Sequence, residues 1–255
     1  MMSNRCAVSY QADLEQARSH YSAGWLYLSR IALHRHLVEH KQCGRGRELL
    51  GMIYHRWREW DIAVEFLEEA TVRVPLQPMA ECALADCYRA TQRSRWARTL
   101  YRGALHRRDA CTPALLAAAA GLDALDDCRA AIAACRRAIQ LDPKMAQSHF
   151  DLSYYLGRCG AAVATVEVSA RRAIALDPDN LTFRIGLAGF LHQHQRSEEA
   201  GPLLNSLSVE HVQLLQCPCC LSRLIGVFEA IGDEERATWC RQRQEILTLT
   251  GERPA

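Results

Sequence analysis

A period of 34 residues organises the middle of this chain of 255 residues. Three consecutive blocks, 44–77, 78–111 and 112–145, align without a gap. Block positions 7, 8, 11, 20, 24 and 27 repeat a fixed order of large apolar and small residues, which reads Leu50, Gly51, Tyr54, Ala63, Leu67 and Ala70 in the first block. A period of this length predicts a row of stacked units, each contacting its neighbours, instead of one globular core.

The pattern continues beyond these three blocks with small departures. Block 146–180 is one residue longer, and its end, RRAIALDPDN, nearly copies the RRAIQLDPKM that closes the block before it. Block 181–207 follows the pattern at first and then loses it. The pair Gly232-Asp233 is typical of a turn between two helices, and counting back from it predicts a degenerate sixth block within 208–255.

These residues resemble the tetratricopeptide-repeat family, in which each repeat is a pair of antiparallel helices. The resemblance runs from about Gly44 to Asn205 and implies an all-α solenoid, a right-handed superhelix of about five to six repeats. The pattern agrees physically, because small residues at positions 8, 20 and 27 let two helices approach while larger apolar residues fill the seam. Pro75 at position 32 ends the second helix of its block. Residues 1–43 fit less well and predict a divergent capping pair that breaks near Ser22.

Composition and motifs narrow the function. The net charge is +2, with 31 basic and 29 acidic residues spread along the chain. This balance provides no strong positive electrostatic potential that could hold a nucleic-acid backbone. No apolar run approaches the roughly eighteen residues of a membrane span. The sequence contains no phosphate-binding loop, zinc-protease motif or nucleophile elbow. We therefore expect a soluble, cytoplasmic, non-enzymatic protein that needs no cofactor and binds neither nucleic acid nor membrane.

The resemblance assigns candidate binding residues, because in the family repeat positions 2, 5, 9, 12 and 13 face a concave groove that binds a peptide. Here these positions give an apolar and aromatic strip flanked by cations, formed by Arg56, Arg89, Leu116, Ala120, Phe150, Tyr154, Arg158 and Ile185. This strip predicts a ligand with apolar anchors and acidic flanks. The alternative is that Phe150 and Tyr154 pack between repeats. The Lys and Asn with which some members grip a terminal carboxylate are absent from positions 5 and 9.

The last block opens with a cysteine cluster. Cys217, Cys219 and Cys220 lie within four residues, and Cys240 follows twenty residues later. Three interpretations remain open, the first being that these cysteines are small buried apolar residues or incidental ones. The second is that they bind zinc, with Cys240 or His211 as the fourth ligand. The third is that Cys217 and Cys220 form a reactive CxxC pair at the start of a helix. A second CxxC pair and a strand before the motif are both missing, so we favour neither a metal nor a redox site.

These observations lead to one main functional hypothesis and two alternatives. The main hypothesis is a scaffold or adaptor that binds a peptide or helix of a partner protein in the concave groove. One alternative is a regulatory protein that acts through zinc or the thiols of the Cys217–Cys220 cluster. The other is self-assembly, in which residues 1–43 dock into the groove of a second copy.

Overall fold

Every regular element in the described part of the chain is a helix, which confirms the predicted all-α solenoid class. The structure is a computed structural model that describes the backbone of residues 3–250 and the side chains of residues 12–249. It divides into two compact units, residues 1–142 and residues 143–255. The outer ends of the two predicted capping segments, residues 1–2 and 251–255, lie outside the described residues.

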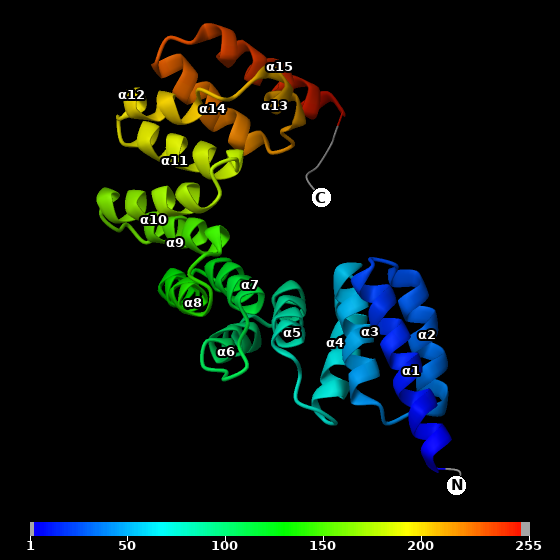
Figure 1. Cartoon of the computed structure of the whole chain (residues 1–255). Helices are drawn as coiled ribbons and strands as arrows, with labels where there is room; N and C mark the ends of the chain where they lie inside the picture. The colour runs from blue at the N-terminus through cyan, green and yellow to red at the C-terminus, as the bar shows by residue number, and fades with distance from the viewer. Residues whose placement is uncertain (1–2, 251–255) are drawn as a thin grey trace. The chain divides into compact units, whose positions relative to one another are not determined.

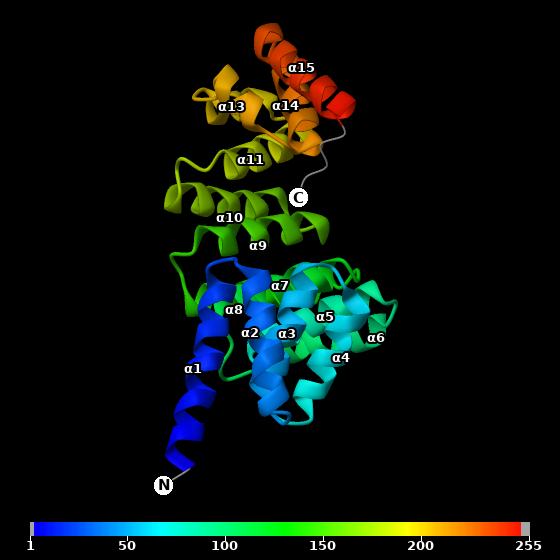
Figure 2. The same cartoon turned by 90° about the vertical axis from the view of Figure 1, so that its right-hand side faces the viewer.

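The first unit is built from consecutive helix pairs (Figure 1). Its helices are α1 Ser3–Ser22, α2 Leu26–Glu39, α3 Gly44–Arg56, α4 Trp60–Thr71, α5 Pro78–Ala90, α6 Ser94–Ala104, α7 Thr112–Asp123 and α8 Cys128–Leu141. Each first helix of a pair contacts the first helix of the next pair, so α1, α3, α5 and α7 form a continuous row. Figure 2 shows α1, α2 and α3 lying beside one another at the start of this row.

The second unit begins with a regular pair and then becomes irregular. Its helices are α9 Ala146–Arg158, α10 Val163–Leu176, α11 Leu181–Gln193, α12 Ser197–Ala200, the 3-10 turn Gly201–Leu204, α13 Val209–Leu214, α14 Pro218–Ala230 and α15 Glu234–Thr250. Helix α11 packs against α10 on one side and α14 on the other (Figure 2). A single apolar core joins α11, α14 and α15.

The predicted repeat phase agrees with the helix starts. Helices α3, α5, α7, α9 and α11 begin at the first residues of the predicted blocks, which are Gly44, Pro78, Thr112, Ala146 and Leu181. Small residues bring the paired helices together, as the pattern requires. Gly51, for example, lies where a Cβ atom would come within 2.5 Å of the Leu67 side chain. The sequence therefore sets both the helix boundaries and the faces that meet.

The fifth block departs from the expected helix pair. Its second helix ends after the four residues of α12 and continues as a 3-10 turn that contains Pro202. Proline has no backbone N–H to donate and its ring clashes with the preceding turn, so an α-helix cannot run through this position undisturbed. The short helix α13 follows, started by a capping box in which Ser208 and His211 hydrogen-bond each other's backbone amides.

The turn inside each repeat places the same residue in the left-handed region. The fifteenth residue counted from the start of α3, α5, α7, α9, α11 and α14 has a φ between 58° and 75° in every case: Arg58, Gln92, Asp126, Gly160, Gln195 and Gly232. This region favours glycine, because a Cβ atom meets the backbone there. The turn geometry therefore persists even where the sequence supplies no glycine.

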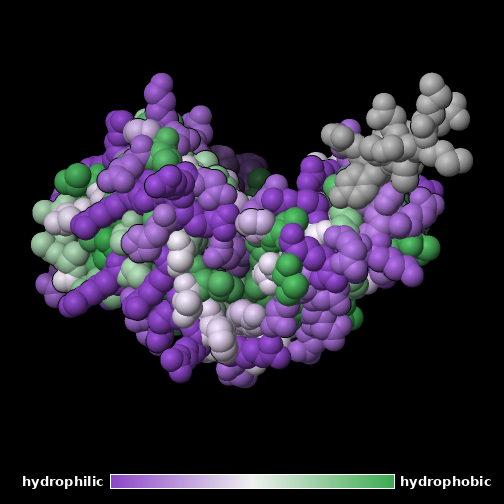
Figure 3. Space-filling model, turned by 90° about the horizontal axis from the view of Figure 1, so that it is seen from below, coloured by the Kyte–Doolittle hydropathy of each residue, from purple (hydrophilic) through white to green (hydrophobic). Residues whose placement is uncertain are grey.

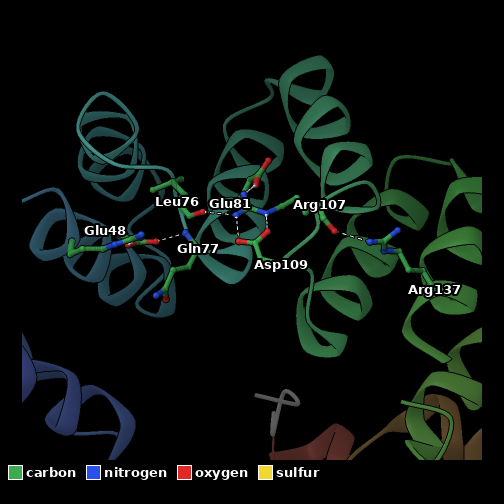
Figure 4. A network of polar contacts seen from close by, with 8 residues as sticks. Glu48, Leu76, Gln77, Glu81, Arg107, Asp109 and Arg137 are labelled. Atoms are coloured by element: carbon green, nitrogen blue, oxygen red, sulfur yellow. Dashed lines mark hydrogen bonds and ion pairs between the residues drawn. The ribbon is translucent and has the colours of Figure 1, made fainter. Parts of the chain in front are cut away.

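Ion pairs and backbone hydrogen bonds join neighbouring repeats of the first unit (Figure 4). The Arg107 guanidinium, in the loop after α6, donates to the carbonyl of Leu76 at 2.9 Å and to the carboxylates of Glu81 and Asp109. Arg137 of α8 donates to the carbonyl of Arg107 at 2.7 Å. One arginine thus ties the loop before α5 to α5 itself and to the loop before α7.

The surface reflects this pairing of amphipathic helices. On the face drawn in Figure 3, hydrophilic side chains predominate, and hydrophobic ones appear between them in separate groups. Among the described helices, none combines the length and the apolar composition that crossing a membrane requires.

Candidate functional site

A groove of about 290 Å³ lies on the second unit, between residues of α9, α10, α11 and α14. It contains three of the predicted binding residues, which are Phe150, Tyr154 and Arg158 of α9. Its other lining residues are Ser153, Gly157, Val166, Ala170, Gly186, Leu187, Phe190, Gln193, His194 and Arg223. The repeat phase brings them together, because α9 and α11 are the first helices of successive pairs.

Phe150 lines one side of this groove, and residues of α11 pack against its ring. Its ring lies 4.7 Å from the ring of Phe183, centroid to centroid, and Phe183 is buried. Gly186 of α11 makes room for the Phe150 ring, since a Cβ atom there would lie 2.6 Å from Phe150 Cε2. Phe150 therefore packs between repeats and also lines the groove, while its contact with a ligand stays a prediction.

Tyr154 and Phe190 supply further aromatic surface to the groove. Tyr154 is 45% exposed, and its ring meets the Tyr155 ring edge-on at 5.3 Å. The Phe190 ring lies 4.6 Å from the His194 ring, and a Cβ atom at Gly157 would be 3.6 Å from it. Aromatic rings of this kind give a ligand large, rigid contact area at low entropic cost.

The groove carries positive but no negative side chains among its lining residues. Arg158 is exposed at the end of α9, and Arg223 reaches in from α14. The aliphatic stem of Arg223 lies against α11, where a Cβ atom at Gly189 would approach its Cδ to 2.9 Å. Guanidinium groups favour carboxylate and phosphate partners, because they can donate two parallel hydrogen bonds.

Known structures resemble this arrangement over most of the chain, whereas no family model and no curated protein matches the sequence. Pseudomonas aeruginosa PilF matches with a TM-score of 0.64 and 17% identity, over 80% of this chain and 91% of its own. The C-terminal part of a tetratricopeptide-repeat protein from Cytophaga hutchinsonii matches with a TM-score of 0.64 and 10% identity, over 94% and 96%. YrrB, described as a tetratricopeptide-repeat protein with an unusual peptide-binding site, matches with a TM-score of 0.53 and 14% identity, over 72% and 90%. The chain has the tetratricopeptide-repeat fold.

Within this repeat fold, Ile185 does not lie in the groove that its repeat position predicts. It is 1% exposed and belongs to the apolar core shared by α11 and α14. The reason is that α14 packs directly on α11, so position 5 of this repeat faces the next helix instead of solvent. A ligand in the groove has no access to this side chain.

Sequence reasoning missed Phe190, His194 and Arg223. These residues fall outside repeat positions 2, 5, 9, 12 and 13, which were the only positions considered. A signal was present nevertheless, because Gly157, Gly186 and Gly189 lie on the facing helices α9 and α11. Each glycine leaves room for one of the groove side chains Phe190, Phe150 and Arg223.

The remaining predicted groove residues lie in the first unit. Leu116 is half-buried and Ala120 is exposed on α7. Arg56 is exposed at the end of α3, with its guanidinium carbon 5.7 Å from the centre of the Tyr21 ring. Arg89 lies 3.8 Å from a carboxylate oxygen of Asp86, which also accepts a hydrogen bond from the buried Tyr101 hydroxyl at 2.5 Å.

The first unit has a second groove, of about 470 Å³, between α1, α3 and α5. Two of its charged side chains, Arg45 and Glu48, are engaged within the fold. Glu48 is buried, accepts a hydrogen bond from the backbone N–H of Gln77 at 2.6 Å, and forms an ion pair with Arg45 at 2.6 Å. These contacts fix α3 against the start of α5 and occupy the Glu48 carboxylate.

The cysteine cluster is brought together only in part. The sulfur atoms of Cys217, Cys219 and Cys220 lie within 4.8 Å of one another at the start of α14. Cys240 does not join them, because it is fully buried in the apolar core, where burial raises its thiol pKa to about 11. His211 is also outside the group.

The three clustered thiols differ in acidity. Burial raises the pKa of Cys220 to about 12, and the neighbouring thiols add to this effect. At Cys217 burial also opposes ionisation, but hydrogen bonding with Cys219 and Cys220 outweighs it and leaves the pKa of Cys217 below its ordinary value. A negative charge on the cluster therefore resides first on Cys217.

Proposed function

We propose that this chain is a non-catalytic scaffold or adaptor that binds a peptide segment of a partner protein in the groove of the second unit. The observation that carries the proposal is the composition of that groove. The exposed Tyr154 ring and the partly buried Phe190 ring line the groove together with Arg158 and Arg223, and no acidic residue is among the lining. An apolar wall with a few fixed polar groups is the usual character of a ligand site.

The chemistry of the groove defines the expected ligand. One large apolar or aromatic side chain packs against Tyr154 and Phe190, and a neighbouring acidic side chain pairs with Arg158 or Arg223. Burial of the apolar anchor supplies most of the affinity, while the arginines speed association and fix the direction of the peptide. The peptide-binding site described for the structurally similar YrrB supports a role of this kind. A cytoplasmic location stays a prediction.

The proposal is tested by selecting peptides from a random library on the purified full chain. The selected peptides are expected to share an apolar or aromatic residue close to an acidic one. Tyr154→Ala and Phe190→Ala should each weaken binding of a selected peptide about tenfold or more, and Arg158→Glu should weaken it further for the more acidic peptides.

Two controls separate a groove effect from a general one. Arg172→Glu changes the same charge on the exposed face of α10, outside the groove, and should leave the affinity within about twofold of wild type. The helical circular dichroism of each variant should match that of the wild type. Selected peptides that bind the Tyr154→Ala and Phe190→Ala variants as tightly as the wild type would rule out this groove.

Self-association is a second candidate function, favoured by the outer face of α2. Leu28, Ile31 and Val38 occur at helical spacing and are 49%, 59% and 72% exposed. Trp25 and Tyr27 extend this apolar surface at the start of the helix. A second copy of the chain, which would cover this apolar surface with its own, is the occupant that we propose.

Sedimentation measurements test this second candidate. The mass should rise with concentration for the wild type and stay monomeric for Ile31→Glu, which places a charge in the apolar face. Val168→Glu, at an equally exposed apolar position on α10, is the matched control and should behave as the wild type does. A wild-type mass that stays monomeric at all concentrations argues against self-association.

A further inference from the structure

The start of α14 presents three thiols to one point in space. Cys217 is the residue before the first turn, and Cys219 and Cys220 belong to that turn, so their sulfur atoms converge to within 4.8 Å of one another. Three sulfurs bound to a single ion at about 2.3 Å each lie about 3.8 to 4.0 Å apart. Small rotations of the side chains about Cα–Cβ are enough to close this difference.

The position in the fold suits a bound thiolate group. The start of a helix carries a partial positive charge that favours anions, although here Pro218 has no N–H and the Cys220 N–H donates to the Cys217 carbonyl at 3.1 Å. Arg223, one turn further along α14, adds a positive charge that acts on Cys219. Cys219 is exposed and the other two thiols are half-buried, so an ion has direct access from solvent.

The number of donors distinguishes between metal ions. In the described part of the chain, the only group of three or more candidate ligands is this set of three cysteines. Structural zinc sites use four protein ligands in a tetrahedron, catalytic zinc sites combine a water with three protein ligands that include histidine, and iron–sulfur clusters need about four cysteines. Cu(I) is a soft ion that prefers thiolates and is satisfied by two or three of them.

We propose that Cys217, Cys219 and Cys220 form a surface site that binds one Cu(I) ion through three sulfur atoms. Binding is a ligand-exchange step without a change in oxidation state: Cu(I) leaves its carrier ligand, thiol protons pass to solvent, and copper–sulfur bonds form. The three sulfur ligands lie outside the peptide groove, and Arg223 is the residue that the two sites share.

An anaerobic titration of the reduced full chain with Cu(I), in competition with a chromogenic Cu(I) chelator, tests this site. The wild type should bind one Cu(I) equivalent more than the triple variant Cys217→Ser, Cys219→Ser, Cys220→Ser. Serine is a favoured residue before the first turn, so Cys217→Ser keeps the start of α14 intact, and Cys219 is exposed. Loss of copper in the variant is then a loss of ligands and not of fold, as unchanged circular dichroism should verify.

A matched control and a competing ion complete the experiment. Cys111→Ser removes a half-buried cysteine of the first unit and should leave the extra equivalent in place. Equimolar Zn(II) should not displace the bound Cu(I). Equal Cu(I) uptake by the wild type and the triple variant would overturn the site, and displacement of Cu(I) by equimolar Zn(II) would overturn the choice of ion.

Discussion

Repeat positions 5 and 9 serve different purposes in the two units. In the first unit two of these positions hold Glu48 and Asp86, whose carboxylates accept hydrogen bonds from the backbone N–H of Gln77 and from the Tyr101 hydroxyl. In the second unit the same positions hold Phe150 and Tyr154, whose rings line an open groove. Both pairs occupy the same repeat positions, on the first helices of their repeats. The repeat position of a side chain therefore does not determine what the side chain contacts.

The difference follows from how completely each polar group is satisfied. Asp86 accepts from the Tyr101 hydroxyl at 2.5 Å and lies 3.1 Å from His55 Nε2, so little of its capacity remains for a ligand. The rings of Tyr154 and Phe190 have no comparable demand, and their exposed surface gains free energy when a ligand covers it. Substitutions should therefore reduce stability in the first unit and binding in the second.

The largest effect is expected for Gly121→Ala in the first unit. A methyl group at Gly121 would overlap the Tyr101 ring, which is fully buried and holds Asp86. Displacing that ring should lower the free energy of unfolding by about 2 to 4 kcal/mol, measured by urea denaturation. Gly103→Ala is the control, because its added Cβ would lie 3.5 Å from Glu81 Oε1, an ordinary contact. Equal stabilities of the two variants would mean that the Tyr101 contact carries no special weight.

Smaller effects on the free energy of unfolding are expected at the fifteenth residue of the repeat, and they should have opposite signs in the two units. Gln92 in the first unit and Gly160 in the second both have a positive φ, 64° and 72°. Gln92→Gly should raise the free energy of unfolding by about 0.5 to 1 kcal/mol, since it removes left-handed strain, and Gly160→Ala should lower it by about 1 kcal/mol. Shifts of the same sign in thermal unfolding would contradict this account of the turn.

The smallest effect is expected at Asp151 of α9, whose surroundings differ from those of Asp86. Burial raises the pKa of Asp151, and its hydrogen bond with Gln147 only partly opposes this. The fold therefore favours the neutral form, so the stability that Asp151 contributes is full at acid pH and is lost as the pH rises through its folded pKa. Asp151→Asn should stabilise the chain by a few tenths of a kcal/mol at pH 7. In urea titrations this gain should vanish near pH 3, and a constant gain at both pH values would refute the assignment.

Most of the fold follows from the sequence, because the repeat period determines the helix starts. The five predicted block starts, from Gly44 to Leu181, coincide with the first residues of helices, and Gly232, from which the sixth block was counted, lies in a turn between two helices. Pro202 also indicates that the second helix of the fifth block is interrupted, although the repeat pattern alone predicted a complete pair of helices. Local propensity and periodicity are sufficient for these features.

The groove follows from the sequence only in part, since it depends on contacts between repeats. Phe150, Tyr154 and Arg158 line one groove, and their role in binding stays a prediction. Ile185 was not, because its exposure is decided by how closely α14 packs on α11, a long-range contact without a local signal. Phe190 and Arg223 belong to the groove through facing glycines on another helix. Packing between repeats thus determines which side chains on the first helices of the repeats are exposed to solvent.

Asp86→Ala and Tyr154→Ala, two substitutions at the same repeat position, test the central claim most directly. Each variant is measured for thermal unfolding and for affinity toward a peptide selected on the wild-type chain. We expect Asp86→Ala to lose about 1 to 3 kcal/mol of stability, because the buried Tyr101 hydroxyl loses its acceptor, while its peptide affinity stays unchanged. Tyr154→Ala should keep its stability and bind about tenfold or more weakly. The opposite pattern, with a destabilised Tyr154→Ala that binds normally, would contradict the division of roles between the two units.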